Sequence, residues 1–525
     1  MSRLTRLPLH PILLTTYPIL ALLATNIIEV EIQVAIRPLL ISLASTVIVL
    51  LAVRLILKDW RKAALVATLL QILFFSYGHL YQLLRTIPFL GMNIGRHRYL
   101  MVAYGAVFVI SLWLILKKMG DISKITQALN LMGIVLLIYP LFCITSYSLQ
   151  VSAGRRVSDE FTTTSKQLDI PDSGFLPDIY YIILDTYTRA DALRDDFGFD
   201  NSPFLEELRS IGFYIADCSR SNYSFTQASL TTALNMEYLP ELYNILAEFG
   251  LDESDVWILL KHSRVRNQLE AIGYSTMAFE TGYEWSRIDD ADVYLSLSSD
   301  PYSIQLLDPF EAMLIKSTAV LILTDLQYKS FAAQTSVVTE QINEINFPYS
   351  GFAQRQLFIL DQLPRIASFQ GPKFVFVHIL IPHAPLIFGP DGEILTDTGY
   401  YGGKGGAAVN REYFRHGYVN EVQFINSRML DIVRTIIDQS RTPPVVIIQG
   451  DTGVRKGNRL QILNAYYLSG KDNPILYSSI TPVNSFRVIF DTYFGTEYGL
   501  LPDESFLDDD TKNSVPETSP ACITQ

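Results

Sequence analysis

The chain has 525 residues, of which 49% are hydrophobic, and its 41 Lys and Arg stand against 53 Asp and Glu for a formal net charge of −12. This length allows about two or three domains. Proteins that bind DNA or RNA do so through basic patches, so the negative net charge argues against a nucleic acid as the partner.

Long apolar runs come first along the chain and predict an α-helical membrane domain over residues 1–151. Five runs, each near the ~20 residues that cross a bilayer, cover residues 9–28, 36–57, 62–84, 99–116 and 126–149. One such run alone could be a buried core helix or, at the N-terminus, a signal peptide. Five runs in succession, separated by short charged loops, favour five membrane spans.

The distribution of basic residues predicts the orientation of these spans. Nine Lys and Arg lie on one side of them and six on the other, and the side richer in basic residues is usually cytoplasmic. The N-terminus is therefore expected in the cytoplasm. With an odd number of spans, everything after Val151 is expected outside it. Residues 1–151 carry 13 Lys and Arg against 4 Asp and Glu, whereas the rest carries 28 against 49.

The second part of the chain alternates strand-like and helix-like segments, which predicts an α/β domain over residues 178–500. Residues 152–177 are polar and predict a linker, and residues 501–525 are acidic and predict a disordered tail. Apolar, β-rich runs predict strands at 179–184, 274–279, 374–380, 445–448 and 465–468. We expect a mostly parallel central sheet with helices on both faces.

Three cysteines are present: Cys143 in a predicted span, Cys218 in the α/β domain and Cys522 in the tail. The absence of any Cys-x-x-Cys pair excludes a zinc site built on cysteines. A disulfide between Cys218 and Cys522 is an open alternative, because disulfides persist outside the cytoplasm.

Polar side chains follow three of the predicted strands. Asp185 follows the run 179–184, His383 follows 374–380 by way of Ile381 and Pro382, and Asp451 follows the run 445–450. The carboxyl ends of parallel strands meet at one edge of a sheet. Two carboxylates and an imidazole there could hold a divalent cation and a phosphate or sulfate ester. Taken singly, each residue could instead be a helix N-cap or a turn residue.

A hydroxyl-rich stretch, SNYSFTQASLTTALN from Ser221 to Asn235, leads into a helix-like segment. Ser224 or Thr226 could therefore stand at a helix N-terminus, where free N–H groups and the helix dipole favour an anionic oxygen. Such a hydroxyl could act as a nucleophile toward a phosphate ester. The alternative is a plain Ser or Thr N-cap.

In order, the motifs are PDIYYIILDTYTRAD, SNYSFTQASLTTALN, IPHAPLIF, VVIIQGDTG and ILNAYYL, placed behind the five apolar runs. This layout resembles membrane-bound members of the sulfatase and alkaline phosphatase superfamily, especially the lipoteichoic acid synthases and phosphoethanolamine transferases. The resemblance implies an α/β domain of alkaline-phosphatase type outside the cytoplasm. It also implies roles for four residues: Asp185 and Asp451 as metal ligands, Thr226 as nucleophile and ligand, and His383 as a contact to the substrate phosphate or leaving group.

A weaker resemblance concerns the segment GYSTMAFETGYEWSR, which is similar to the stretch that supplies a tryptophan and an arginine in the synthases. It implies that Trp285 and Arg287 bind substrate, because a guanidinium offers two parallel donors to an anion. Packing of Trp285 in the protein core is the alternative.

One position departs from the family pattern. The family has a histidine after the third-motif aspartate, where this chain has Thr452, and a threonine hydroxyl is a weak ligand for zinc or manganese. Arg455 nearby cannot coordinate a cation. Thr186 stands where two-metal members have a second carboxylate. We therefore expect one divalent ion at most, Mn, Zn or Mg, held weakly.

Two functional hypotheses follow from these motifs. The first is a membrane-anchored, metal-dependent hydrolase or transferase that acts on a phosphate or sulfate ester of a lipid, phospholipid or envelope glycan outside the cytoplasm. The Cys/Ser-x-Pro-x-Arg motif of typical sulfatases is absent around residues 221–235, which favours phosphoryl transfer. The second is a catalytically weakened protein of the same fold with a binding or assembly role in the envelope, as Thr452 would suggest.

Overall fold

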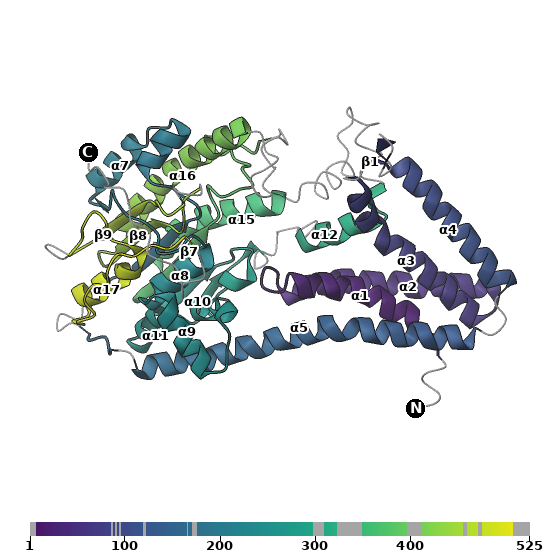
Figure 1. The fold of residues 1–525 in the computed structure, drawn as a ribbon. Coiled ribbons are helices and arrows are strands. Elements are labelled where there is room, and N and C mark those ends of the chain that lie inside the picture. The colour runs from purple at the N-terminus through teal and green to yellow at the C-terminus, as the bar shows by residue number, and fades with distance from the viewer. Residues whose placement is uncertain are drawn as a thin grey trace. The chain divides into compact units, whose positions relative to one another are not determined.

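The structure is a computed structural model that describes residues 7–85, 88–89, 92–93, 96–118, 122–164, 166–170, 176–297, 309–322, 349–395, 411–454, 459–470 and 475–507. The chain divides into two compact units, shown together as ribbons in Figure 1. One unit comprises Met1–Ser148 and Ile304–Gly351, and the other comprises Leu149–Ser303 and Phe352–Gln525.

The first unit is helical. Its elements are α1 (His10–Thr25), η2 (Ile32–Ala35), α2 (Ile36–Leu57), α3 (Trp60–Arg85), the short strands β1 (Pro88–Phe89) and β2 (Met92–Asn93), α4 (His97–Lys117), the first part of α5 (Ser123–Thr164), and α12 (Pro309–Ser317). Many large apolar side chains on these helices are exposed, for example Leu55 at 78% and Val102 at 73%. Such a surface suits a lipid environment.

Among the described residues, four helices are long and apolar enough to cross a membrane. They are Ile32–Leu57, Trp60–Leu84, His97–Lys117 and Ser123–Val157. The first predicted run forms only the 16-residue helix α1, which is shorter than a span usually is. The prediction of a helical membrane domain is confirmed, whereas the number of five spans stays a prediction.

Helix α12 belongs to the helical unit, although the sequence analysis assigned its residues to the α/β domain. It lies close to α3, because a Cβ atom on Gly78 would meet the backbone oxygen of Lys316 at 2.2 Å. The guanidinium of Arg37 also donates two hydrogen bonds to the carboxylate of Glu311 on α12. Glycine at position 78 thus permits the close approach of the two helices.

The second unit is built on a seven-stranded sheet in the order β4-β9-β8-β3-β7-β5-β6. These strands are β3 (Ile179–Leu184), β4 (Tyr214–Ile215), β5 (Ser275–Phe279), β6 (Val293–Leu295), β7 (Lys373–Ile379), β8 (Val445–Gly450) and β9 (Asn464–Leu468). Strands β6, β5, β7, β3 and β8 pair in parallel, and β9 runs antiparallel to both of its neighbours. The expected mostly parallel central sheet is confirmed.

Helices cover both faces of this sheet, with α7 and α16 on one side and α8, α11 and α17 on the other (Figure 1). The helical elements of this unit are α6 (Ala190–Ala192), η3 (Leu193–Phe197), α7 (Ser202–Ile211), α8 (Thr226–Asn235), α9 (Leu239–Glu248), η4 (Glu253–Asp255), α10 (Ile258–Lys261), α11 (Arg264–Ala271), η5 (Glu284–Ser286), α15 (Tyr349–Gln362), η7 (Leu363–Ser368), α16 (Arg411–Gln439) and α17 (Pro482–Tyr493). Every residue of β3, β7 and β8 is buried, as expected for central parallel strands covered on both faces.

Helix α5 continues to Thr164, through the first part of the segment that the sequence predicted as a linker. Within the second unit it packs closely on α10, since a Cβ atom on Gly154 would meet the side chain of Ile258 at 1.9 Å. One residue later, Arg155 lies 3.9 Å from the carboxylate of Asp290. The end of the last membrane-length helix is therefore part of the packing of the α/β unit.

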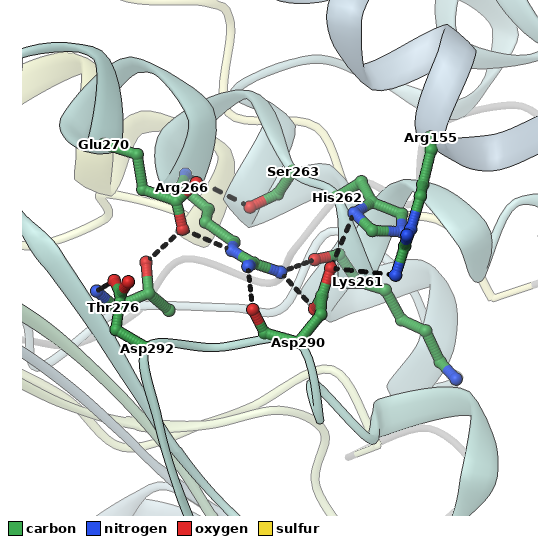
Figure 2. Close-up of polar contacts among 9 residues, drawn as sticks. All are labelled: Arg155, Lys261, His262, Ser263, Arg266, Glu270, Thr276, Asp290 and Asp292. Carbon is green, nitrogen blue, oxygen red and sulfur yellow. Dashed lines mark hydrogen bonds and ion pairs between the residues drawn. The ribbon is translucent and has the colours of Figure 1, made fainter.

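Asp290 is the centre of the charged cluster in Figure 2. Its Oδ1 accepts a 2.7 Å hydrogen bond from Nη1 of Arg266, and Nδ1 of His262 lies 3.7 Å from its Oδ2. Arg266 in turn donates from Nε to Glu270 at 2.7 Å. Each mostly buried charge thus faces an opposite charge, which offsets the cost of removing it from water.

The C-terminal segment packs on the α/β unit as far as it is described. Phe506 is 8% exposed and its ring stacks on that of Tyr223 at 5.3 Å, and Asp503 accepts hydrogen bonds from the backbone and hydroxyl of Thr481. The remainder of the predicted disordered tail, residues 508–525, lies outside the described residues. Cys218 is disulfide-bonded, and Cys522, which the sequence left open as its partner, lies in that undescribed remainder.

Candidate active site

The register of the sheet places Asp185 and Asp451 side by side. Strands β3 and β8 are parallel neighbours in which Leu184 pairs with Gly450, so the next residue of each strand is an aspartate at the same level. Neighbouring strands lie about 4.8 Å apart. Both carboxylates belong to residues that are buried, Asp185 at 4% exposure and Asp451 at 0%.

His378 joins these two aspartates from the other side of β3. It pairs with Ile183 in the parallel register of β7 with β3, and side chains two residues apart on a strand share a face. Its imidazole therefore lies on the same face as Asp185. Nε2 of His378 is 3.4 Å from Oδ2 of Asp185, and the histidine is 0% exposed.

Together these three residues form a buried group that fits a divalent metal ion. One ligand atom of each, from Asp185, His378 and Asp451, lies within 4.8 Å of the others. Among the described residues, Oδ1 of Asp185 and both ring nitrogens of His378 are buried without a hydrogen-bond partner. Buried polar atoms without partners are costly, and two carboxylates with one imidazole are a usual ligand set for such a cation.

The two carboxyl groups have opposite pKa shifts. Burial together with the neighbouring charge of Asp185 raises the pKa of Asp451 to about 6. Burial also acts to raise the pKa of Asp185, but the charge of His383, the imidazole of His378 at 3.4 Å and the charge of Arg459 outweigh it and leave this pKa lowered. Two neighbouring carboxyl groups with divergent pKa values are typical of functional sites.

Thr226 is the first residue of helix α8 and meets this group through Asp451. Its Oγ1 donates a 2.5 Å hydrogen bond to Oδ2 of Asp451. The hydroxyl of Ser229, one turn further along α8, donates to the backbone oxygen of Asp451 at 2.8 Å. These two contacts fix the N-terminus of α8 over the end of β8. The candidate Ser224 instead donates its hydroxyl to the backbone oxygen of Leu507.

The residue after Asp185 has a strained backbone. Thr186 has a φ of 58°, a left-handed conformation that is unfavourable for a β-branched residue. Its N–H donates to Oδ1 of Asp451 at 2.7 Å, and its carbonyl oxygen accepts from the hydroxyl of Tyr418 at 2.7 Å. Strained backbone of this kind occurs at functional sites, where surrounding contacts stabilise it. Here the strained conformation directs the N–H of Thr186 toward Asp451.

His383 is half-buried. Its charge helps to keep the pKa of Asp185 low, although burial acts to raise it. Its Nδ1 lies 2.6 Å from the backbone oxygen of Ala384. Because a carbonyl oxygen only accepts, Nδ1 carries the hydrogen, and Nε2 is the atom left for a substrate.

Trp285 and Arg287 have different environments. The indole of Trp285 packs 5.9 Å from the ring of His378 and is 5% exposed. The guanidinium of Arg287 lies 3.5 Å from the carboxylate of Glu284 and 3.4 Å from that of Asp289. The structure therefore brings Trp285 to the buried group and pairs Arg287 with local carboxylates.

Thr452 is buried at 0% exposure, and its hydroxyl has no hydrogen-bond partner among the described residues. The imidazole of the buried group belongs instead to His378 on β7, two strands away from β8 in the sheet. The sequence analysis missed His378, although a histidine inside the apolar run Phe374–Leu380 was a signal, because a polar side chain in a fully buried strand requires a partner.

Comparison with known proteins finds no matching family model and no matching curated protein. Several solved structures show distant similarity. The zinc complex of the C-terminal periplasmic domain of EcEptC from Escherichia coli has a TM-score of 0.43 at 11% identity, over 66% of this chain and 95% of that one. Lipooligosaccharide phosphoethanolamine transferase A from Neisseria meningitidis, an integral membrane protein, has a TM-score of 0.33 at 12% identity, over 90% of this chain and 89% of that one.

A putative sulfatase from Bacteroides thetaiotaomicron has a TM-score of 0.36 at 12% identity, over 63% of this chain and 74% of that one. Similarity at these TM-scores is too weak to establish a fold or an activity. The neighbours named here are two phosphoethanolamine transferases and a putative sulfatase.

Proposed function

We propose that this protein is a membrane-anchored hydrolase or transferase of phosphate or sulfate esters, with Thr226 as its nucleophile. The observation that carries the proposal is the 2.5 Å hydrogen bond from Thr226 to Asp451 at the edge of the buried group of Asp185, His378 and Asp451. A nucleophilic hydroxyl needs an adjacent acceptor for its proton, and Oδ2 of Asp451 is such an acceptor.

Asp185, His378 and Asp451 are the residues that would hold a divalent metal ion. When bound, this ion would neutralise negative charge on the ester group and lower the pKa of a neighbouring hydroxyl. His378 must be neutral to act as a ligand.

In the proposed reaction, Oγ1 of Thr226 attacks the phosphorus or sulfur atom of the ester while its proton passes to Asp451. The bond from that atom to the leaving oxygen breaks, and His383, in the form that carries a hydrogen on both ring nitrogens, gives the leaving oxygen the proton on Nε2. Water or an acceptor alcohol then attacks the transferred group and gives its proton to Nε2 of His383, while the bond to Oγ1 of Thr226 breaks and Asp451 returns the proton to that oxygen. The free N–H groups at the start of α8, where Thr226 is the first residue, favour negative charge on the transferred group.

The location of the substrate follows from the topology. With the five spans that the sequence predicts, the bias of basic residues favours an α/β unit outside the cytoplasm, and four helices among the described residues are long and apolar enough to be such spans. The disulfide-bonded Cys218 supports the same location. An ester carried by a lipid or an envelope glycan is accessible to a domain anchored in this way.

A catalytically weakened binding protein is the second candidate function. The observation that favours it is Thr452, whose buried hydroxyl takes the place of the family's histidine. The two candidates differ in turnover, since only the enzyme needs Thr226 to react.

The test uses the full chain in detergent with Mg²⁺, Mn²⁺ or Zn²⁺ and the chromogenic substrates bis(p-nitrophenyl) phosphate and p-nitrophenyl sulfate. The enzyme should release p-nitrophenol from one of them, and Thr226→Ala should abolish the release. Thr435→Ala, which removes an exposed hydroxyl bonded only to its own helix, is the matched control and should retain it. Equal release by Thr226→Ala and wild type would refute the proposed nucleophile. Metal binding without release from either substrate would favour the second candidate.

A further inference from the structure

The proposed site brings an anionic ester close to two carboxylates, Asp185 and Asp451. Like charges repel strongly where water is excluded, so a fixed cation beside Thr226 would assist binding even with a metal ion present. The sequence analysis assigned this role to Arg287. In the structure, however, the guanidinium of Arg287 lies within 3.5 Å of Glu284 and within 3.4 Å of Asp289, which already neutralise its charge.

Arg459 is a second arginine, and its backbone is fixed next to the site. The N–H of Gly453, two residues after Asp451, donates to its carbonyl oxygen at 2.5 Å. The following residue, Leu460, accepts a 2.7 Å hydrogen bond from the N–H of Ser221. The segment that begins at Arg459 therefore lies between the end of β8 and the loop that leads into Thr226.

The segment after Arg459 is also tied to the strand end that carries Asp185. Gln461 and Ile462 form isolated bridges with Arg220 and Thr188. These two partners belong to the loops that precede Thr226 and follow Asp185. Arg459 is thus anchored between the nucleophile and the first carboxylate, at a place set by backbone hydrogen bonds.

The side chain of Arg459 extends over Phe225, the residue immediately before Thr226. Its Cζ lies 5.1 Å from the centroid of the Phe225 ring, and Phe225 is 45% exposed. Among the described residues, the guanidinium of Arg459 forms no ion pair and no side-chain hydrogen bond.

We propose that Arg459 binds the nonbridging oxygens of the phosphate or sulfate group that is presented to Thr226, with Phe225 holding its guanidinium in place. A planar guanidinium donates two parallel hydrogen bonds to two oxygens of such a group. Stacking on an aromatic ring restricts the side chain before the anion arrives and so reduces the entropy lost on binding. This assignment rests on the proposed function, because it names the residue that recognises the reacting group.

The experiment measures the affinity of the metal-loaded full chain in detergent for inorganic phosphate and inorganic sulfate by isothermal titration calorimetry. Arg459→Ala should weaken the Kd of the preferred anion by at least about tenfold, as expected for a lost charged hydrogen bond. Arg459→Lys should have an intermediate Kd, because it keeps the charge and loses the planar pair of donors. Arg434→Ala removes an exposed arginine paired with Glu207 and should leave the Kd unchanged.

Metal content and thermal unfolding of each variant separate a lost contact from a lost site. Arg459→Ala should keep the metal content of the wild type while its anion affinity falls. Anion affinity that is unchanged in Arg459→Ala, or reduced in Arg287→Ala alone, would overturn the assignment while leaving the proposed function in place. A wild-type protein that holds metal but binds neither anion would overturn both.

Discussion

The hydroxyl of Thr226 donates a 2.5 Å hydrogen bond to the carboxylate of Asp451, although 225 residues separate them in the sequence. One residue begins helix α8 and the other ends strand β8. This contact joins a hydroxyl to a buried carboxylate whose partners can hold a cation, and it is the basis of the first prediction.

Replacement of Thr226 should show whether its oxygen reacts. We expect Thr226→Ala to lower kcat for ester release by about 10³-fold or more, as is usual when a nucleophile is removed. Thr226→Ser should retain part of the activity, because it keeps the hydroxyl that faces Asp451. Steady-state kinetics with a chromogenic ester measure both. Similar kcat values for the alanine and serine variants would argue against a role for the oxygen.

Thr452 should prove dispensable for metal binding. Its hydroxyl is buried and has no partner among the described residues, and burial of an unpaired hydroxyl costs about 1–3 kcal/mol. Thr452→Val, which keeps the shape and removes the oxygen, should therefore leave metal content unchanged and stabilise the fold slightly. Metal analysis and thermal unfolding test this. Loss of metal in Thr452→Val would instead identify the threonine as a ligand.

Glu421 should stabilise the loop that carries His383. Its Oε1 accepts hydrogen bonds from the backbone N–H groups of Ile387 and Phe388 at 2.7 and 3.1 Å. Glu421→Ala leaves both buried donors unpaired and should reduce the free energy of unfolding by about 2–4 kcal/mol. Glu421→Gln keeps an acceptor oxygen and should cost less than about 1 kcal/mol near pH 5. Denaturant unfolding of both variants measures the difference.

The same residue predicts a pH dependence. Burial, which outweighs the hydrogen bonds from Phe388 and Ile387, raises the pKa of Glu421 well above its usual value of 4.5. A group with a raised pKa in the folded protein stabilises it fully below the unfolded pKa, and this stability is lost as pH rises toward the folded pKa. Wild type should therefore lose stability relative to Glu421→Gln from pH 4.5 upward, by at most about 1.4 kcal/mol per pH unit. A constant difference between pH 5 and pH 8 would contradict the raised pKa.

The Asp290 cluster should stabilise the fold at neutral pH and lose this effect as the pH falls. Burial acts to raise the pKa of Asp290, but the charges and hydrogen bond of Arg266, followed by His262 and Arg155, leave it lowered. Its contribution is thus present above the unfolded pKa and is lost as pH falls. At pH 7 we expect Asp290→Asn to cost about 2 kcal/mol.

An exposed ion pair provides the control for the Asp290 cluster. Asp195 pairs with Arg194, and both side chains are at least half exposed, so Asp195→Asn should change stability by less than about 0.5 kcal/mol. Thermal unfolding at pH 4 and pH 7 compares the two variants. If Asp290→Asn lowers the free energy of unfolding at pH 7 by no more than Asp195→Asn does, the cluster is not stabilising.

The sequence predicted those features that depend on local pattern and strand ends. Asp185 and Asp451 each follow a buried strand, and because β3 and β8 pair in parallel, their positions at the strand ends place them together. Ser224 or Thr226 was predicted at a helix N-terminus because hydroxyl residues lead into a helix-like segment, and the helix begins at Thr226. The catalytic and binding roles of these residues stay predictions.

His378 could not be assigned by periodicity, because β7 is buried on both faces and shows no alternation. Helix α12 was assigned to the α/β domain because nothing in its local sequence shows that it packs on α3. For Arg287, by contrast, the sequence held a signal that was not used. Glu284 stands three residues before it and Asp289 two residues after it, and both pair with it in the structure.

Metal stoichiometry of the His378 variant tests the central claim, that Asp185, His378 and Asp451 form the metal site that serves Thr226. Inductively coupled plasma mass spectrometry of the purified full chain should find about one divalent transition metal per wild-type chain. His378→Ala should lose most of it, while His416→Ala, which removes a histidine whose side chain is 65% exposed, should retain it. Equal metal content in His378→Ala and wild type would contradict the account.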